Sequence, residues 1–173
     1  MPQNAQQPSF AECLQNATRS ALHLETRDTY ADNERFSAWR LGAKTDWDDR
    51  PSWWRPFHDH VAQAVHRGVA IQRVRVVSEP VSEYIRWEHY VTRANLAAGE
   101  QVRWVSRRHA VDLLLPCNDF WLFDGGLARI HHFAGNGDLI EDEFSSEPAL
   151  LKVLATAFEA AWERGVPHDD YQV

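Results

Sequence analysis

Apolar positions up to Gly68 recur mostly every three or four residues, which is the spacing of a helix with one buried face. The pattern predicts two or three helices at the start of the chain. Their ranges are 10–24, a short helix that Asp32 or Asn33 caps and that ends at Gly42, and 53–67 with Ser52 as its cap and Gly68 as its end. Ser, Asp and Asn suit helix starts because their side chains accept hydrogen bonds from free amides, and Gly suits helix ends.

The rest of the chain alternates between strand-like runs and helical segments. The predicted strands are 71–78, 100–106, 119–124, 127–133 and 138–144, and the predicted helices are 80–92 and 148–164. A helix between the first two strands makes them parallel, and glycine-rich turns between the later strands indicate a β-meander. The predicted fold class is therefore α/β: a mixed sheet with a βαβ unit, a β-meander and a C-terminal helix, preceded by two or three N-terminal helices.

The chain length of 173 residues fits one domain, which we expect over 9–173. Within it, 9–68 is predicted to be a helical N-terminal layer and 69–173 the α/β core. The polar residues 1–8 are predicted to be disordered.

Composition narrows the class of protein. Hydrophobic residues make up 44% and charged residues 25%, as in soluble globular proteins. No apolar run approaches the roughly 18 residues of a membrane span, and the N-terminus lacks the apolar segment of a signal peptide, so we expect a cytoplasmic protein. The net charge of −7 argues against direct binding of nucleic acid. Cys13 and Cys117 lie far apart and the histidines are scattered, so neither a metal site nor another cofactor is predicted.

The tripeptide Ser-Glu-Pro occurs at 78–80 and at 146–148, each time before a predicted helix. Proline suits the first helical position and a carboxylate suits the positive end of the helix dipole, so both copies predict helix starts. The first copy also follows a strand of the βαβ unit, where open α/β sheets place ligands. Ser78 and Glu79 are therefore also candidate ligand contacts.

Glu88 falls on the apolar stripe of the predicted helix 80–92. A carboxylate at such a position needs a partner or lines a cavity. A salt bridge to Arg75 or Arg103, a rotated helix that exposes Glu88, and a role in a pocket remain open alternatives.

Glu88, together with other acidic and aromatic residues of the second half of the chain, defines a candidate pocket. Its candidate acid–base groups are Glu88, Asp119 and Asp124, and its candidate ligand contacts are Arg75, Ser78, Glu79, Tyr84, Trp87, Glu88 and Trp121. Two carboxylates can perform acid–base chemistry when their environments separate their pKa values. Asp124 precedes two glycines and is equally an ordinary turn residue. The eight tryptophans are expected mainly in the core, with a Trp-lined cleft as the alternative.

Three motifs are similar to those of an actinobacterial family of unknown function: RVRVVSEP at 73–80, YIRWE at 84–88 and FWLFD at 120–124. The order of elements also resembles one half of the phospholipase D-like fold. The resemblance covers nearly the whole chain. It implies a regulatory role beside helix-turn-helix regulators, and it implies a homodimer because phospholipase D-like halves usually pair.

Active phospholipase D-like enzymes carry His-x-Lys-x4-Asp, in which the His is the nucleophile and the Lys holds phosphate. With the Asp of that motif aligned on Asp124, Cys117 and Asp119 occupy the His and Lys positions. A second register from His131 has Phe133 at the Lys position. Neither register is intact, and a carboxylate in place of the Lys repels phosphate. The resemblance therefore implies a degenerate fold that does not hydrolyse phosphodiesters by this mechanism.

Two functional hypotheses follow. The first is a non-catalytic small-ligand-binding or regulatory protein, a partner of a helix-turn-helix transcriptional regulator. The alternative is an enzyme of specialised metabolism that uses cleft carboxylates as acid–base groups on a small polar substrate. The alternative requires Glu88 and Asp119 to converge on one cleft.

Overall fold

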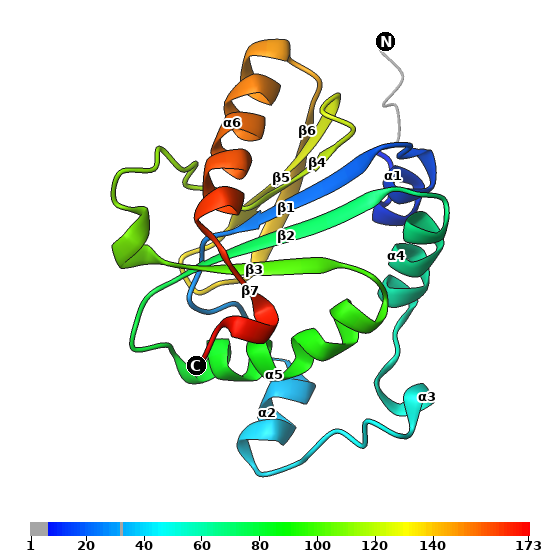
Figure 1. Ribbon diagram of the computed structural model, residues 1–173, viewed down its shortest axis with the longest axis vertical. Coiled ribbons are helices and arrows are strands. Elements are labelled where there is room, and N and C mark those ends of the chain that lie inside the picture. The colour runs from blue at the N-terminus through cyan, green and yellow to red at the C-terminus, as the bar shows by residue number, and fades with distance from the viewer. Residues whose placement is uncertain (1–6, 32) are drawn as a thin grey trace.

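A mixed β-sheet with helices on both faces forms the centre of the computed structural model (Figure 1). The structure describes residues 7–31 and 33–173. The predicted fold class is confirmed. The disorder predicted for residues 1–8 falls almost wholly outside the described residues, as does Asp32, and Asn33 caps the second helix by accepting a hydrogen bond from the amide of Phe36.

The sheet has seven strands in the described part of the chain, in the order β6-β5-β4-β1-β2-β3-β7. Their bounds are β1 Ser20–Glu25, β2 Ala70–Val77, β3 Gln101–Ser106, β4 Phe120–Phe123, β5 Leu127–Phe133, β6 Leu139–Ser145 and β7 Val166–Pro167. Strands β1, β2 and β3 are parallel, as the predicted βαβ unit requires for the last two. Strand β4 runs antiparallel to β1 and begins the meander β4-β5-β6.

Helix α6 covers one face of the sheet, and α1, α4 and α5 cover the other (Figure 1). The helices are α1 Phe10–Asn16, α2 Glu34–Arg40, α3 Arg50–Trp53, α4 Pro56–His66, α5 Glu83–Ala97 and α6 Pro148–Arg164, with 3-10 turns at Arg107–Ala110 and His168–Asp170. Within the described residues, no helix has both the length and the apolar character needed to cross a bilayer.

Residues 20–25 form strand β1, so the prediction of one helix over 10–24 is wrong. Helix α1 ends at Asn16, and the chain then lies between β2 and β4 as a central strand. A short apolar run such as SALHLE satisfies helical and strand spacing equally well, and pairing with distant strands decides between them. The segment 9–68 is therefore not a purely helical layer.

The predicted helix 53–67 is broken into α3 and α4 at Trp54 and Arg55. Arg55 precedes Pro56, and the proline ring disfavours helical backbone in the residue before it. Arg55 is accordingly extended, with φ −127° and ψ 161°. Ser52 lies inside α3 and is not a helix cap.

The two Ser-Glu-Pro motifs have different structures. At the second, the Glu147 carboxylate accepts hydrogen bonds from two amides of α6, and Pro148 is the first helical residue. At the first, α5 begins only at Glu83, where Ser82 is the cap, and the helix runs on to Ala97. The prediction that residues 78–80 start a helix is therefore wrong. Contacts with other parts of the chain hold Ser78 and Glu79 in a loop.

The two faces of the central strands differ in polarity. Leu24, Val74 and Val76 pack with α6 in an apolar core. Because side chains alternate along a strand, the neighbouring residues of β1 and β2 point to the opposite face. These residues are His23, Glu25, Arg73 and Arg75. They form a polar row on the face that α1, α4 and α5 only partly cover.

Candidate functional site

A cleft of about 460 Å³ opens over this polar row of the sheet. We call it the sheet cleft. Its lining includes five arginines, Arg35, Arg55, Arg73, Arg75 and Arg129, together with three histidines. Among the described residues that line it, Glu88 is the one acidic side chain. Aromatic side chains, Trp87 and Trp121 among them, supply much of the remaining wall.

Glu25 lies between two arginines at the floor of this region. Its Oε1 is 2.7 Å from Nη1 of Arg73, and its Oε2 is 2.5 Å from Nε of Arg75. The register of the sheet places Glu25 directly beside Arg75. Burial raises the pKa of the Glu25 carboxyl, but the two arginines outweigh burial and hold that pKa well below its usual range. Glu25 is therefore ionised in the folded protein.

Each of these arginines has a second carboxylate. The Nε of Arg73 is 2.6 Å from Oε1 of Glu100, and Nη2 of Arg75 is 2.6 Å from Oε2 of Glu88. Together with Glu25, these four side chains form what we call the ion network. Its three carboxylates more than balance the charges of its two arginines. The network therefore fixes the floor of the cleft but adds no excess positive charge.

Two of the three alternatives that the sequence left open for Glu88 hold together, because Glu88 pairs with Arg75 and also lines the sheet cleft. Burial and the nearby Glu25 charge raise the pKa of the Glu88 carboxyl, although Arg75 opposes the shift. The hydroxyl of Tyr84 donates a hydrogen bond of 3.3 Å to its second oxygen.

Asp119 is buried at the start of β4 and does not reach the lining of the sheet cleft. One of its oxygens accepts a hydrogen bond of 2.7 Å from the amide of Thr26, and the other accepts one from the hydroxyl of Tyr30. Burial raises the pKa of Asp119, against the effect of the Tyr30 hydrogen bond. Thr26, whose amide donates to Asp119, directly follows Glu25 in the chain, so Asp119 lies near the ion network.

Asp124 lies at the other end of β4, about 16 Å from Asp119 at roughly 3.3 Å per strand residue. Its carboxylate accepts hydrogen bonds from the amides of Thr18, Arg19 and Ser20 at 2.7–2.9 Å. Burial raises the pKa of Asp124, but these amides outweigh it and the pKa is lowered. The structure therefore does not bring Asp124 together with Glu88.

The candidate ligand contacts fall into two groups, those that line or support the sheet cleft and those that lie outside it. Arg75, Trp87, Glu88 and Trp121 line the sheet cleft, and Tyr84 supports Glu88 from α5. The two residues of the first Ser-Glu-Pro motif do not line it. Ser78 bonds through its amide and hydroxyl to the Asp28 carboxylate, and Glu79 accepts hydrogen bonds from the hydroxyls of Ser106 and Tyr171.

The sequence interpretation missed the site residues His23, His58, Arg35, Arg55 and Arg129. His23 is buried and stacks on Trp121 with ring centroids 4.1 Å apart. Recognising β1 as a strand would have placed His23 and Glu25 on one face. No comparable signal exists for Arg35 and Arg55, which come from unrelated helix starts.

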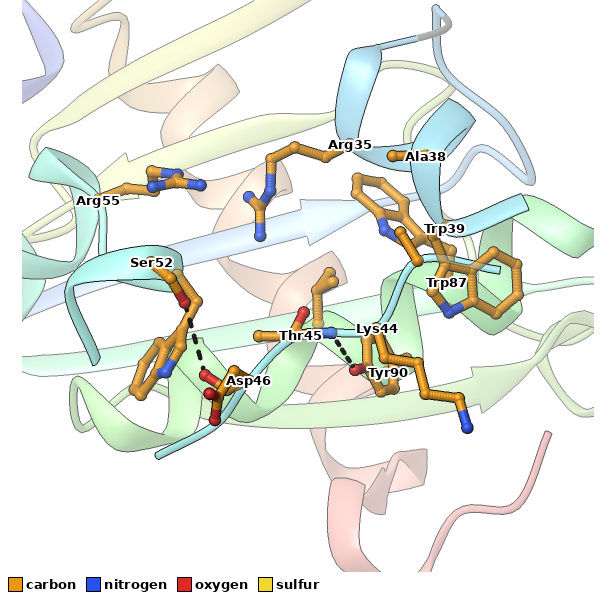
Figure 2. Close-up of a pocket in the computed structure, with 13 residues that line it drawn as sticks. Arg35, Ala38, Trp39, Lys44, Thr45, Asp46, Ser52, Arg55, Trp87 and Tyr90 are labelled. Carbon is orange, nitrogen blue, oxygen red and sulfur yellow. Dashed lines mark hydrogen bonds between the residues drawn. The ribbon is translucent and has the colours of Figure 1, made fainter. Parts of the chain in front are cut away.

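A second cavity, of about 330 Å³, adjoins the sheet cleft (Figure 2). We call it the aromatic cavity because Trp39, Trp53, Trp87 and Tyr90 line it. Arg35, Arg55, Trp87 and Val91 line both cavities. Within the described residues, no three His, Cys, Asp or Glu side chains are arranged to hold a metal ion.

The comparisons with known proteins identify a family and a fold. The family model described as "Domain of unknown function (DUF6879)" matches residues 8–173. No curated protein matches the chain significantly.

Two solved structures are similar to the chain. The phospholipase D family member Nuc from Salmonella typhimurium is 13% identical, with a TM-score of 0.50, over 94% of this chain and 88% of that chain. The archaeal chromatin protein TrmBL2, which binds DNA, is 10% identical, with a TM-score of 0.48, over 90% of this chain and 47% of that chain. The likeness to Nuc shows a phospholipase D-like fold, as predicted.

Proposed function

We propose that this chain, which belongs to the family described as "Domain of unknown function (DUF6879)", is a non-catalytic protein that binds a small molecule in the sheet cleft. The observation that carries the proposal is the cleft of about 460 Å³. Small-molecule sites are typically concave, about 300–1,000 Å³ in volume, and combine apolar walls with a few placed polar groups. The ion network holds the polar groups of this cleft in fixed positions before any ligand arrives.

The positions that correspond to the phospholipase D motif support the non-catalytic part of the proposal. Cys117, at the place of the nucleophile, is exposed. Asp119, at the place of the phosphate-holding Lys, has both of its oxygens engaged by Thr26 and Tyr30. Asp119 is therefore not free to hold a phosphate. Cys117 makes no side-chain hydrogen bond to a base in the described part of the chain, and a thiol nucleophile needs such a base.

A thermal-shift screen of purified protein tests the proposal with nucleotides, amino acids, sugar phosphates and lipid head groups. A ligand at 100 times its dissociation constant adds about 2.7 kcal/mol of stability, or about 5–10 °C in melting temperature for a domain of this size. We expect at least one compound to give such a shift, and we expect Val91→Trp to abolish it. Val91 lines both cavities, so an indole at this position fills the space that a ligand needs.

The matched control is Val153→Trp, which adds the same side chain on an exposed position of α6 and should keep the shift. Circular dichroism checks that both variants fold. The proposal is wrong if no compound stabilises the protein, or if every shift persists undiminished in Val91→Trp.

Asp119 does not line the sheet cleft, so an enzyme that uses Glu88 and Asp119 together is not supported. The remaining alternative is an enzyme that uses Glu88 alone as a general acid or base, and the position of Glu88 in the cleft together with its raised pKa favours it. A carboxyl group with a raised pKa exchanges protons more readily near neutral pH. If this alternative holds, a compound that binds is converted to product, which NMR detects. We expect Glu88→Gln to stop that conversion and Glu159→Gln, on the exposed side of α6, to keep it. Recovery of every bound compound unchanged would exclude the alternative.

A partnership with a transcriptional regulator and pairing of two copies of the chain are further proposals. The first rests on the resemblance of the RVRVVSEP, YIRWE and FWLFD motifs to the actinobacterial family named in the sequence analysis. The second rests on the usual pairing of phospholipase D-like halves. Both proposals are compatible with a ligand in the sheet cleft, because a regulatory module often responds to a small molecule.

A further inference from the structure

We propose that Arg35 and Arg55 form a binding site for an oxyanion where the sheet cleft meets the aromatic cavity. The ligand would carry a phosphate or carboxylate on a flat ring, with the ring in the aromatic cavity. This inference rests on the proposed ligand-binding function and specifies the chemical class of the ligand.

The two arginines come from different helices but meet at one place. Arg35 is in the first turn of α2, and Arg55 is the residue that caps α4. Figure 2 shows their guanidinium groups turned toward one another across the space at the edge of the aromatic cavity. Because both residues line both cavities, a group held between them can extend into either cavity.

Among the described residues, no acidic side chain forms a salt bridge with either of these two arginines, in contrast to the other arginines of the cleft. Arg73 and Arg75 belong to the ion network, and Arg129 pairs with Asp142 at 2.5 Å. Neither Arg35 nor Arg55 has a salt bridge to any residue in the described part of the chain. The side chain of Arg55 makes one hydrogen bond, of 3.4 Å, to the carbonyl of Trp54. Among the described residues that line the sheet cleft, the excess positive charge is therefore concentrated at this pair, and the aromatic cavity adds one residue of each sign, Lys44 and Asp46.

Repulsion between the positive charges of Arg35 and Arg55 also indicates that this pair lacks a balancing anion in the described part of the chain. Partial withdrawal of its guanidinium group from water, and then the charge of Arg55, lower the pKa of Arg35, although the side chain as a whole is exposed. Burial and the charges of Arg35 and Arg55 also lower the pKa of His58, although Glu100 opposes the shift. An oxyanion between these groups would remove the repulsion and would accept charge-assisted hydrogen bonds from the guanidinium groups.

His58 can supply a further donor. Its Nδ1 accepts a hydrogen bond of 2.9 Å from the amide of Arg55, so Nε2 carries the proton of the neutral ring. His58 is buried and lines the sheet cleft, where an Nε2–H group is a neutral hydrogen-bond donor for an anion. The N–H donors of the two planar guanidinium groups, together with the Nε2–H donor of His58, suit the oxygen atoms of a carboxylate or phosphate.

The aromatic cavity provides the surface for a ring. Trp53 and Trp87 are 8% and 6% exposed, so they form fixed walls. The hydroxyl of Tyr90 accepts a hydrogen bond of 2.8 Å from the amide of Thr45, which ties the segment before α3 to α5 (Figure 2). A cavity of about 330 Å³ with such walls suits a flat ring better than a flexible chain.

Isothermal titration calorimetry on the full chain tests the inference with four probes: phenyl phosphate, benzoate, inorganic phosphate and phenol. Phenyl phosphate and benzoate are expected to bind, and the order of their affinities shows whether the site prefers a dianion or a monoanion. Phosphate, which has no ring, and phenol, which has no anionic group, should each bind at least about tenfold more weakly. Arg35→Gln and Arg55→Gln should each weaken the better ring anion at least about tenfold, which is about 1.4 kcal/mol.

The matched control is Arg86→Gln, which removes one positive charge from an exposed position of α5 outside both cavities and should leave the affinity unchanged. Arg35 is itself exposed, so its replacement should not unfold the protein. Failure of both ring anions to bind, or equal affinities in Arg35→Gln, Arg55→Gln and Arg86→Gln, would overturn the inference.

These outcomes are distinguishable from failure of the proposed function. A compound whose thermal shift is abolished by Val91→Trp but unchanged by Arg35→Gln and Arg55→Gln overturns the oxyanion site alone. If no compound of the screen stabilises the protein, and none of the four probes binds, the proposed function itself fails.

Discussion

Replacement of Glu25 by glutamine is expected to lower the free energy of unfolding by about 2–4 kcal/mol. Glu25 is 13% exposed and accepts ionic hydrogen bonds from both Arg73 and Arg75. Glutamine keeps the shape but leaves these two buried guanidinium groups with Glu100 and Glu88 as their remaining anions. The glutamine side chain has one acceptor oxygen where the carboxylate has two, so at least one of the two guanidinium groups loses a charge-assisted hydrogen bond and keeps a buried donor without a partner.

Urea denaturation followed by circular dichroism measures this loss. The matched control is Glu141→Gln, which removes a carboxylate from an exposed position of edge strand β6 and should change stability by less than about 0.5 kcal/mol. If both variants are equally stable, the ion network does not hold the cleft together as we infer.

The effect of Glu25→Gln should depend on pH in a defined direction. The folded pKa of Glu25 is lowered, so its contribution to stability is present above the unfolded pKa and is lost as the pH falls. The stability difference between wild type and Glu25→Gln should therefore be full at pH 7 and shrink below about pH 5. Denaturation curves at a series of pH values check this trend. A difference that grows on acidification would contradict the lowered pKa.

Asp124→Ala is expected to destabilise the protein by about 2–4 kcal/mol without a direct effect on the ligand site. The substitution removes the acceptor of the amides of Thr18, Arg19 and Ser20, which fix the entry into β1. It also places alanine at φ 51°, a left-handed conformation that aspartate and asparagine tolerate better. Asp124→Asn should consequently lose less than Asp124→Ala.

Urea denaturation gives the size of the effect, and Asp48→Ala, in an exposed loop, is the matched control. Ligand affinity, measured well below the melting temperature, should equal that of the wild type. A stable Asp124→Ala protein that loses binding or turnover would instead support the earlier hypothesis that Asp124 is a functional carboxylate.

Local patterns predicted the second half of the chain because the strands there alternate clearly and have glycine turns between them. Strand β5 and helix α6 have the predicted bounds, and the bounds of β2, β3, β4 and β6 differ from the prediction by one residue at one or both ends. The first half was harder. Strand β1 satisfies two periodicities at once, and the break before Pro56 depends on a single backbone restriction inside an apolar helical pattern.

The predictions for the candidate site also succeeded where they depended on local spacing and failed where they depended on contacts between distant segments. Glu88 falls on the apolar stripe of α5 and Arg75 alternates with valines on β2, so spacing made both of them candidates but left a salt bridge and a role in a pocket open; the structure places both in the lining of the cleft. Asp119 and Asp124 flank strand β4. Sequence spacing could not show that backbone amides and hydroxyl groups of the N-terminal segment occupy the oxygens of both carboxylates.

The sequence by itself therefore determined the α/β class and the order of elements in the second half of the chain, because both depend on spacing along single segments. Only the tertiary structure placed Glu25 between Arg73 and Arg75, and only it brought Arg35 to Arg55. Such contacts join residues from separate elements. Their energies depend on burial and on which charges remain unpaired, and these properties exist only once the sheet and its helices have packed together.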